Sequence, residues 1–360
     1  MLVLYITYVD FNHAASGSAV RPEKMYRAFL EEGHEVKLLT GSQERRCREQ
    51  RRAAVAEISA WLDTNRPDLC YIESPVQPIL WSFDRRLIRK IHRKGIPIGY
   101  FYRDYYRKFP DLFPRRKGLT GRCKELWLDI LQSRLDRLLC CADVVYFPSR
   151  QAMEMFSYPR MEMLPPAGER RENLPEREGN TCIYVGGLTN HYGGEMLLRA
   201  FSILNEGAER FPLILVCREA EWRKMPPEYA SKPWLEVRHA SGEELIPLYA
   251  RAAAGLIADR LPNRYNDLAH SVKLFEYMSE GLPVVYVHSA ATDEFVRPLG
   301  FGIGTDFDPE KFASGVRAMF ADPAAYRARR EAALRAIREG NCWVHRVRQV
   351  IRDLTEGERP

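Results

Sequence analysis

The sequence predicts an α/β protein built from two Rossmann-like domains that face a cleft. Its 360 residues suffice for about two domains at roughly 150 residues each. Short apolar runs alternate with longer segments of helical periodicity, which is typical of parallel sheets covered by helices. Residues 158–181 interrupt this alternation with a stretch rich in Pro, Gly and charge. Such a stretch indicates a linker between two α/β series.

The first series starts at the N-terminus and contains five predicted strands. They are 2–8, 36–40, 69–72, 96–102 and 144–147. A first helix is expected to start at Pro22, because proline suits the first turn, and to end at Gly33. Three more helices are predicted at about 44–64, 79–93 and 126–138.

The second series repeats the pattern after the linker. Its predicted strands are 182–185, 213–217, 235–238, 255–258, 284–287 and 301–304, with helices at about 194–205, 242–251, 271–280 and 309–321. Two further helices are expected between 324 and 354. The expected domains are therefore 1–165 and 175–335, and the ligand site should lie at the carboxyl ends of their parallel strands.

Composition and charge exclude several classes of protein. No apolar run approaches the length of a transmembrane helix, and the first residues do not have the form of a signal peptide. We therefore expect a cytoplasmic protein with reduced cysteines. Residues 1–170 carry a net charge of +8 and residues 171–360 one of −2. The basic half favours an anionic partner such as a membrane surface, and no nucleic-acid module is present.

The most informative segment is HSVKLFEYMSEGLPVV, residues 270–285. It predicts a helix that begins near Ser271 and stops at Gly281 before a buried strand. Backbone amides of Ser271, Val272 and Lys273 at the helix start form a potential diphosphate site, and the Lys273 ammonium adds a positive charge. Glu276 can accept hydrogen bonds from both hydroxyls of a ribose. The alternative is that Lys273 and Glu276 form an exposed i,i+3 pair.

These residues resemble the nucleotide-sugar signature of GT-B-type glycosyltransferases, specifically the retaining family four (glycosyl transferases group 1). Further segments resemble that family in the same order: 16–36, 141–149, 184–201 and 341–351. The last is similar to a C-terminal tryptophan helix, here within 336–360, that crosses back to the first domain. The resemblance implies a first domain that binds the acceptor and a second that binds the donor.

Three departures from the family pattern concern the donor site. Gly187 and Tyr192 stand where the family has Arg and Lys, so amides near Gly186 and Gly187 are expected to face the phosphates. Arg260 is a candidate replacement for the missing cation, or else a surface residue of a turn. Leu268 stands in place of a first glutamate, which leaves Asp267 or His270 as candidate contacts to the donor sugar.

In the first domain, Arg103 and Asp104 stand where many members of the family have a His-Asp pair. Asp104 is a candidate catalytic base and Arg103 a candidate phosphate contact; the alternative is a salt bridge in an aromatic loop. Ser16 and Gly17, between the first strand and helix, are further donor-binding candidates. The aromatic residues of this loop are expected either to stack on a sugar or to pack the loop: Tyr102, Tyr105, Tyr106 and Phe109.

The expected function is therefore sugar transfer from a nucleotide-diphosphate sugar to a glycan or lipid-linked acceptor, as in hexosyltransferases. The resemblance implies retention of configuration, no cofactor and no metal. A nucleotide-sugar epimerase and a non-catalytic sugar-nucleotide-binding or assembly protein are the alternatives. Two basic clusters, 45–52 and 115–124, are either solvated surfaces or contacts to anionic lipid. Beside the second, Leu112, Phe113, Leu126 and Trp127 suit shallow membrane contact.

Overall fold

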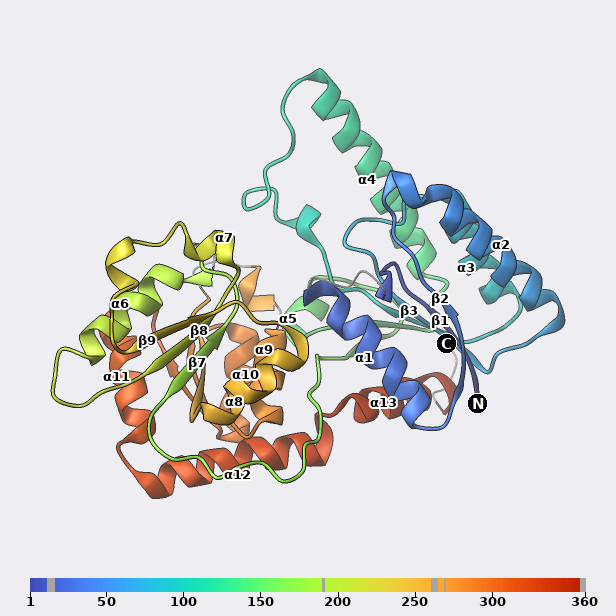
Figure 1. Ribbon diagram of the computed structural model, residues 1–360. Helices are drawn as coiled ribbons and strands as arrows, with labels where there is room; N and C mark the ends of the chain where they lie inside the picture. Colours follow the sequence, from blue (N-terminus) through green and yellow to red (C-terminus); the bar gives the residue numbers. More distant parts are fainter. Residues whose placement is uncertain (12–16, 190–191, 260–264, 269, 357–360) are drawn as a thin grey trace. The chain divides into compact units, whose positions relative to one another are not determined.

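The computed structural model describes residues 1–11, 17–189, 192–259, 265–268 and 270–356. The chain divides into two compact units (Figure 1). One consists of Met1–Pro165 with Trp343–Pro360, and the other of Pro166–Cys342. The expected boundary at residue 336 falls inside α12 (Pro323–Gly340), which continues without interruption to Gly340.

The first unit is a parallel six-stranded sheet of order β2-β1-β3-β4-β5-β6. The strands are β1 (Leu2–Ile6), β2 (Glu35–Leu39), β3 (Leu69–Glu73), β4 (Ile98–Phe101), β5 (Val144–Phe147) and β6 (Met161–Met163). The helices are α1 (Gly17–Glu31), α2 (Arg48–Thr64), α3 (Ser82–Arg93), α4 (Leu119–Leu139) and the short α5 (Arg150–Met153). The five predicted strands are confirmed. The expected linker is wrong at its start, because β6 pairs with β5 as an edge strand.

The last helix, α13 (Trp343–Thr355), belongs to the first unit. It packs along α1 and reaches β3 and β4 (Figure 1). The approach is close: a Cβ added to Gly99 in β4 would lie 3.1 Å from Leu354 Cδ1. The Tyr146 hydroxyl also donates a 3.3 Å hydrogen bond to Asp353. The prediction that the tryptophan helix returns to the first domain is therefore confirmed.

The second unit is a parallel six-stranded sheet of order β12-β11-β10-β7-β8-β9. Its strands are β7 (Cys182–Val185), β8 (Leu213–Val216), β9 (Leu235–Arg238), β10 (Ala254–Ile257), β11 (Val284–Val287) and β12 (Gly302–Thr305). Its longer helices are α6 (Gly194–Leu204), α9 (Val272–Ser279), α10 (Ala290–Leu299), α11 (Pro309–Phe320) and α12. α6 packs against α11, and α9 against α12. The predicted α/β class with two Rossmann-like sheets is confirmed.

One arginine of the first basic cluster belongs to the core. Arg51 is 1 % exposed, and its guanidinium contacts Asp84 at 3.0 Å, the Thr7 carbonyl at 2.8 Å and the ring of Tyr8. Burial raises the pKa of Asp84, and Arg51 opposes that shift. Arg51 is therefore not available to lipid. Among the described residues, no helix is both long and apolar enough to cross a membrane.

Candidate functional site

A cavity of about 160 Å³ opens at the carboxyl edge of the second sheet. Its walls come from the ends of β10 and β11 and from the start of α9: Ile257, Asp259, Val287, Ser289, Ser271 and Lys273. The strand order reverses between β7 and β10, so the loops that follow these strands diverge here. The Ser271 side chain makes no capping hydrogen bond at the start of α9. Because Ser271 and Lys273 line the cavity, the start of α9 presents the positive end of the helix dipole to it.

Lys273 is a buried cation in the wall of this cavity. The residue is 9 % exposed, with Nζ 3.3 Å from Asp259 Oδ1 and 4.6 Å from the centre of the Tyr184 ring. A buried ammonium needs such partners because the loss of hydration destabilises its charge. The alternative of an exposed pair with Glu276 is wrong, because Asp259 is the partner. Sequence analysis missed Asp259, since it follows a different strand.

The loop after β7 brings backbone to the same place. A Cβ added to Gly186 would lie 3.5 Å from Lys273 Nζ, so this glycine is beside the cation. A Cβ added to Gly187 would lie 2.5 Å from Cδ2 of Tyr192. Tyr192 therefore occupies the space that a side chain at position 187 requires. Gly187 and Tyr192 stand where the family pattern has Arg and Lys. Because the Tyr192 ring needs the space beside Gly187, these two substitutions depend on each other.

Glu276 is half-buried one turn further along α9. Its Oε2 accepts a 3.0 Å hydrogen bond from the hydroxyl of Tyr249, in α8 (Ile246–Arg251). Burial, and then the Glu276 carboxylate, raise the pKa of Tyr249, so the hydroxyl remains a donor. Glu276 is not among the described residues that line the 160 Å³ cavity. Its contact with a ribose stays a prediction.

The other donor-site candidates have different positions. His270 lines the cavity and packs against the rings of Phe275 and Phe295. Asp267 accepts a 3.1 Å hydrogen bond from the amide of Ala290 at the start of α10, a structural role. Gly17 begins α1. Ser16 and Arg260 lie outside the described residues.

In the first unit, the ends of β3 and β4 meet at the carboxyl edge. The amide of Arg103 donates a 3.2 Å hydrogen bond to Ser74 Oγ, which joins the two loops. Arg103 Nε lies 3.1 Å from Asp104 Oδ2, so the salt bridge considered as an alternative is present. Asp104 also lines a cavity of about 330 Å³. Asp104 is therefore both a partner of Arg103 and part of a cavity wall.

A buried ion pair that sequence analysis missed lies at the end of β3. Arg21 Nε is 3.1 Å from Oε1 of Glu73, and the Tyr71 hydroxyl donates to the same oxygen at 2.8 Å. Burial lowers the pKa of Arg21, but the Glu73 carboxylate and the hydroxyls of Tyr71 and Tyr5 together more than offset this, so the pKa is raised. The Arg21 guanidinium also lies 3.6 Å from the centre of the Phe101 ring. This network fixes α1 against the end of the sheet.

Comparisons with known proteins decide the fold. Residues 197–352 match a family model described as glycosyl transferase-like. Sucrose-phosphate synthase from Thermosynechococcus elongatus matches with a TM-score of 0.67 and 14 % identity over 97 % of both chains. The chain has the GT-B fold. WaaG, a glycosyltransferase involved in lipopolysaccharide biosynthesis, matches with a TM-score of 0.64 and 14 % identity over 99 % of this chain and 100 % of its own.

A third solved structure that is similar to this chain holds a nucleotide. HepE of Anabaena, in complex with UDP, matches with a TM-score of 0.63 and 12 % identity over 99 % of this chain and 100 % of its own. The same protein also appears in complex with UDP-glucose. A search of curated protein sequences finds no match.

The aromatic loop of this GT-B protein is mostly packed. Tyr102, Tyr105 and Phe109 are 4 %, 3 % and 6 % exposed. Phe156 contacts Tyr102 and Tyr105, with ring centres 5.2 and 5.7 Å apart. These side chains are expected from the sequence either to stack on a sugar or to pack the loop. The structure shows that these three pack the loop. Tyr106 is partly exposed and packs edge to face on Phe113.

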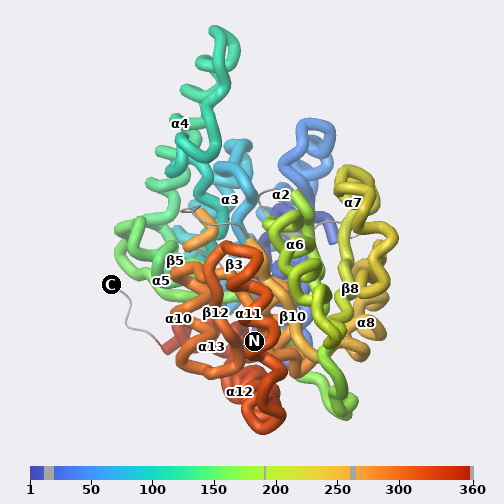
Figure 2. The backbone as a smooth tube through the Cα atoms, turned by 90° about the vertical axis from the view of Figure 1, so that its left-hand side faces the viewer, coloured from blue at the N-terminus to red at the C-terminus, as the bar shows by residue number. Residues whose placement is uncertain are grey.

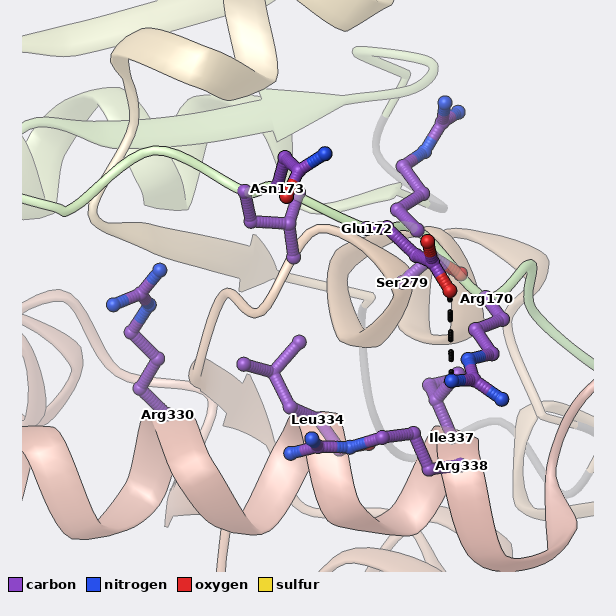
Figure 3. Close-up of a pocket in the computed structure, with 10 residues that line it drawn as sticks. Arg170, Glu172, Asn173, Ser279, Arg330, Leu334, Ile337 and Arg338 are labelled. Carbon is purple, nitrogen blue, oxygen red and sulfur yellow. Dashed lines mark hydrogen bonds and ion pairs between the residues drawn. The ribbon is translucent and has the colours of Figure 1, made fainter.

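A further cavity of the second unit, of about 340 Å³, is lined by arginines (Figure 3). It lies at the other end of α9, beside Ser279 and α12. Its cations already have partners: Arg170 pairs with Glu172 at 3.5 Å, and Arg330 donates to the Pro175 carbonyl at 2.8 Å. The positive end of α9 faces the 160 Å³ cavity instead. We therefore place the candidate site at Lys273.

Proposed function

We propose that the protein is a glycosyltransferase that moves a sugar from a nucleotide-diphosphate sugar to a glycan or lipid-linked acceptor. We propose that transfer retains the anomeric configuration, as in family four, and that it needs no metal or cofactor. One observation carries the proposal: buried Lys273 lies at the start of α9, beside Gly186, at the carboxyl edge of the second sheet. The glycosyl transferase-like match of residues 197–352 supports it. The UDP complexes of HepE favour a uridine nucleotide as donor.

In this proposal the second unit binds the donor. The diphosphate contacts the amides at Ser271–Lys273, the Lys273 ammonium and the amide of Gly187. The amide of Gly186, expected to face the phosphates, instead donates a 3.0 Å hydrogen bond to the Val216 carbonyl, so Gly186 contributes only close approach of the backbone. Negative charge on the diphosphate grows as the sugar departs, so these donors stabilise the transition state more than the ground state. Asp259 holds the ammonium while the site lacks an anion. Glu276 accepts hydrogen bonds from the ribose.

The first unit binds the acceptor. Asp104 accepts the proton of the acceptor hydroxyl or orients that hydroxyl, and Arg103 fixes the carboxylate through their 3.1 Å ion pair. Both residues follow β4, at the sheet edge where parallel α/β sheets bind ligands. We propose a cytoplasmic protein that contacts an anionic membrane surface on the inner face.

A panel of nucleotide sugars tests the donor assignment. Thermal unfolding with UDP-, GDP- and other nucleotide sugars should show one base that raises the Tm, because a ligand of the native state stabilises it by mass action. The responding sugar is then incubated with and without acceptor mixtures. Conversion without acceptor would indicate an epimerase, and binding without turnover would indicate a non-catalytic binding protein.

A single substitution tests the role of Glu276. Glu276→Ala should weaken the calorimetric affinity for the responding nucleotide sugar, and Glu310→Ala, an exposed acid in the first turn of α11, serves as control. Unchanged affinity in Glu276→Ala, with the fold intact, would remove Glu276 from the site.

A further inference from the structure

The first half of α4 has an apolar face that the first unit leaves uncovered. Figures 1 and 2 show these turns extending beyond the sheet of their unit. The face consists of Leu119, Leu126, Trp127 and Ile130, which are 80 %, 63 %, 46 % and 44 % exposed. Contiguous exposed apolar side chains of this size mark an interaction surface.

Helical geometry separates this face from the core. At about 100° per residue, the four side chains span an arc of roughly 100°. Measured from Leu119, the buried residues Leu128, Leu131 and Leu135 lie at roughly 120–180°, outside the exposed arc, which ends with Trp127 at roughly 80°. Trp127 borders the buried face but is 46 % exposed, so core packing, the alternative to membrane contact, is wrong for this residue. One apolar face of α4 packs against the first unit, and the second apolar face is exposed and available to a partner.

Charge around this face indicates the chemistry of that partner. Residues 115–124 contain five basic side chains and no acidic one. Arg116, Lys117, Arg122 and Lys124 are exposed. Arg115 pairs with Asp129 at 3.0 Å, so it contributes less positive charge. An apolar face rimmed by cations complements an anionic lipid surface, where acyl chains lie beneath negative headgroups.

The cavity at Asp104 is continuous with the same segment. Its walls include Phe113, Arg115 and Arg116, together with Val76, which is 44 % exposed. An apolar wall with nearby arginines suits an anionic amphiphile rather than a neutral sugar. A molecule held by the loop at 113–116 would thus reach the Asp104 carboxylate.

We propose that residues 113–130 form a docking surface for an anionic lipid bilayer. Leu119, Leu126, Trp127 and Ile130 insert among the acyl chains, and the basic residues of 115–124 contact the headgroups. The cavity at Asp104 then receives its acceptor from that bilayer. Both steps rest on the proposed function, because it includes contact with an anionic membrane surface; binding of the nucleotide sugar does not depend on the docking.

Vesicle binding by the full chain tests the proposal. Vesicles of phosphatidylglycerol and phosphatidylcholine in equal parts should retain the protein in sedimentation, and phosphatidylcholine alone at least about tenfold less. The double variant Leu126→Asp/Ile130→Asp should lose at least about tenfold in partitioning, because charge on the inserted face opposes burial in lipid. Its Tm should not change, since both side chains are exposed. Ile246→Asp, at a residue 38 % exposed in α8, is the matched control and should bind as the original protein does.

Three results would overturn the docking surface. They are failure of the original protein to bind the mixed vesicles at low salt, equal binding by the double variant, and equal binding to the neutral vesicles. A dimer in analytical ultracentrifugation that the double variant abolishes, without vesicle binding, would assign the face to a second copy instead. Nucleotide-sugar affinity, measured on the same samples, reports separately on the proposed function.

Discussion

Replacement of Lys273 by methionine tests the donor site most directly. The residue is 9 % exposed, and methionine has a similar length and no charge. Lys273→Met therefore keeps most of the packing against Tyr184 while it removes the ammonium. It also leaves Asp259 without its ion-pair partner, but that carboxylate is 29 % exposed and can be hydrated.

The magnitude follows from these contacts. A hydrogen bond between a charged donor and a phosphate contributes about 1.5–3 kcal/mol, which corresponds to a loss of about tenfold to a hundredfold in affinity for UDP. The effect on stability should be smaller, about 1 kcal/mol or less, since the pair with Asp259 is partly solvated. Asp259→Asn should act in the opposite direction on binding. It removes the anion that competes with phosphate for Lys273, so UDP affinity should rise about severalfold.

Calorimetric titration with UDP and with uridine separates the phosphate contact from the base contact. Lys273→Met should weaken UDP and leave uridine unchanged. The control is Lys311→Met, because Lys311 also pairs with an aspartate, Asp306, but is 64 % exposed in the side chain. That variant should bind both ligands as the original protein does.

Equal UDP affinity in a folded Lys273→Met protein would refute the reasoning, because the diphosphate would then lie elsewhere. An equal loss for uridine would refute it as well. Such a loss would show that Lys273 supports the shape of the site rather than the phosphates.

Three further predictions concern other parts of the chain. Asp104→Asn should lower turnover by about a hundredfold or more and change donor affinity little; full transfer activity would remove Asp104 from the site. Gly193→Ala should lower the free energy of unfolding by about 2 kcal/mol or more, because φ is +67° and a Cβ would lie 1.9 Å from the Ala258 carbonyl oxygen. Gly33→Ala, where φ is +77° and space is open, should lose about 1 kcal/mol in the same denaturant titration. Hydrogen bonds from Arg251, and further contacts with Arg238, lower the pKa of Glu236 to about 2. Glu236 therefore stabilises the fold above pH 4.5 and loses this effect as the pH falls to 2. Glu236→Gln should lower stability at pH 7 by about 1 kcal/mol, because the residue is partly solvated, and the difference in Tm should vanish near pH 2.

Local sequence patterns predicted most elements of the fold. The strand expected at 182–185 is β7, and the helix expected at 271–280 is α9 (Val272–Ser279). Both elements have strong local signals. The signal for β7 is a continuous apolar run, which is typical of a strand buried on both faces. The signal for α9 is the helical spacing of apolar residues between Ser271 and Gly281. β6 was missed because three residues of an edge strand, all half-exposed, lack such a signal.

The sequence by itself determined two parallel α/β sheets and a cationic helix start at Lys273, because these properties depend on neighbours within about one helical turn or one strand. Only the tertiary structure decided that Asp259 pairs with Lys273 and that Tyr192 fills the space above Gly187. It also decided which apolar face of α4 is buried and which is exposed. Contacts between side chains on different elements depend on how those elements pack, and no local periodicity encodes that packing.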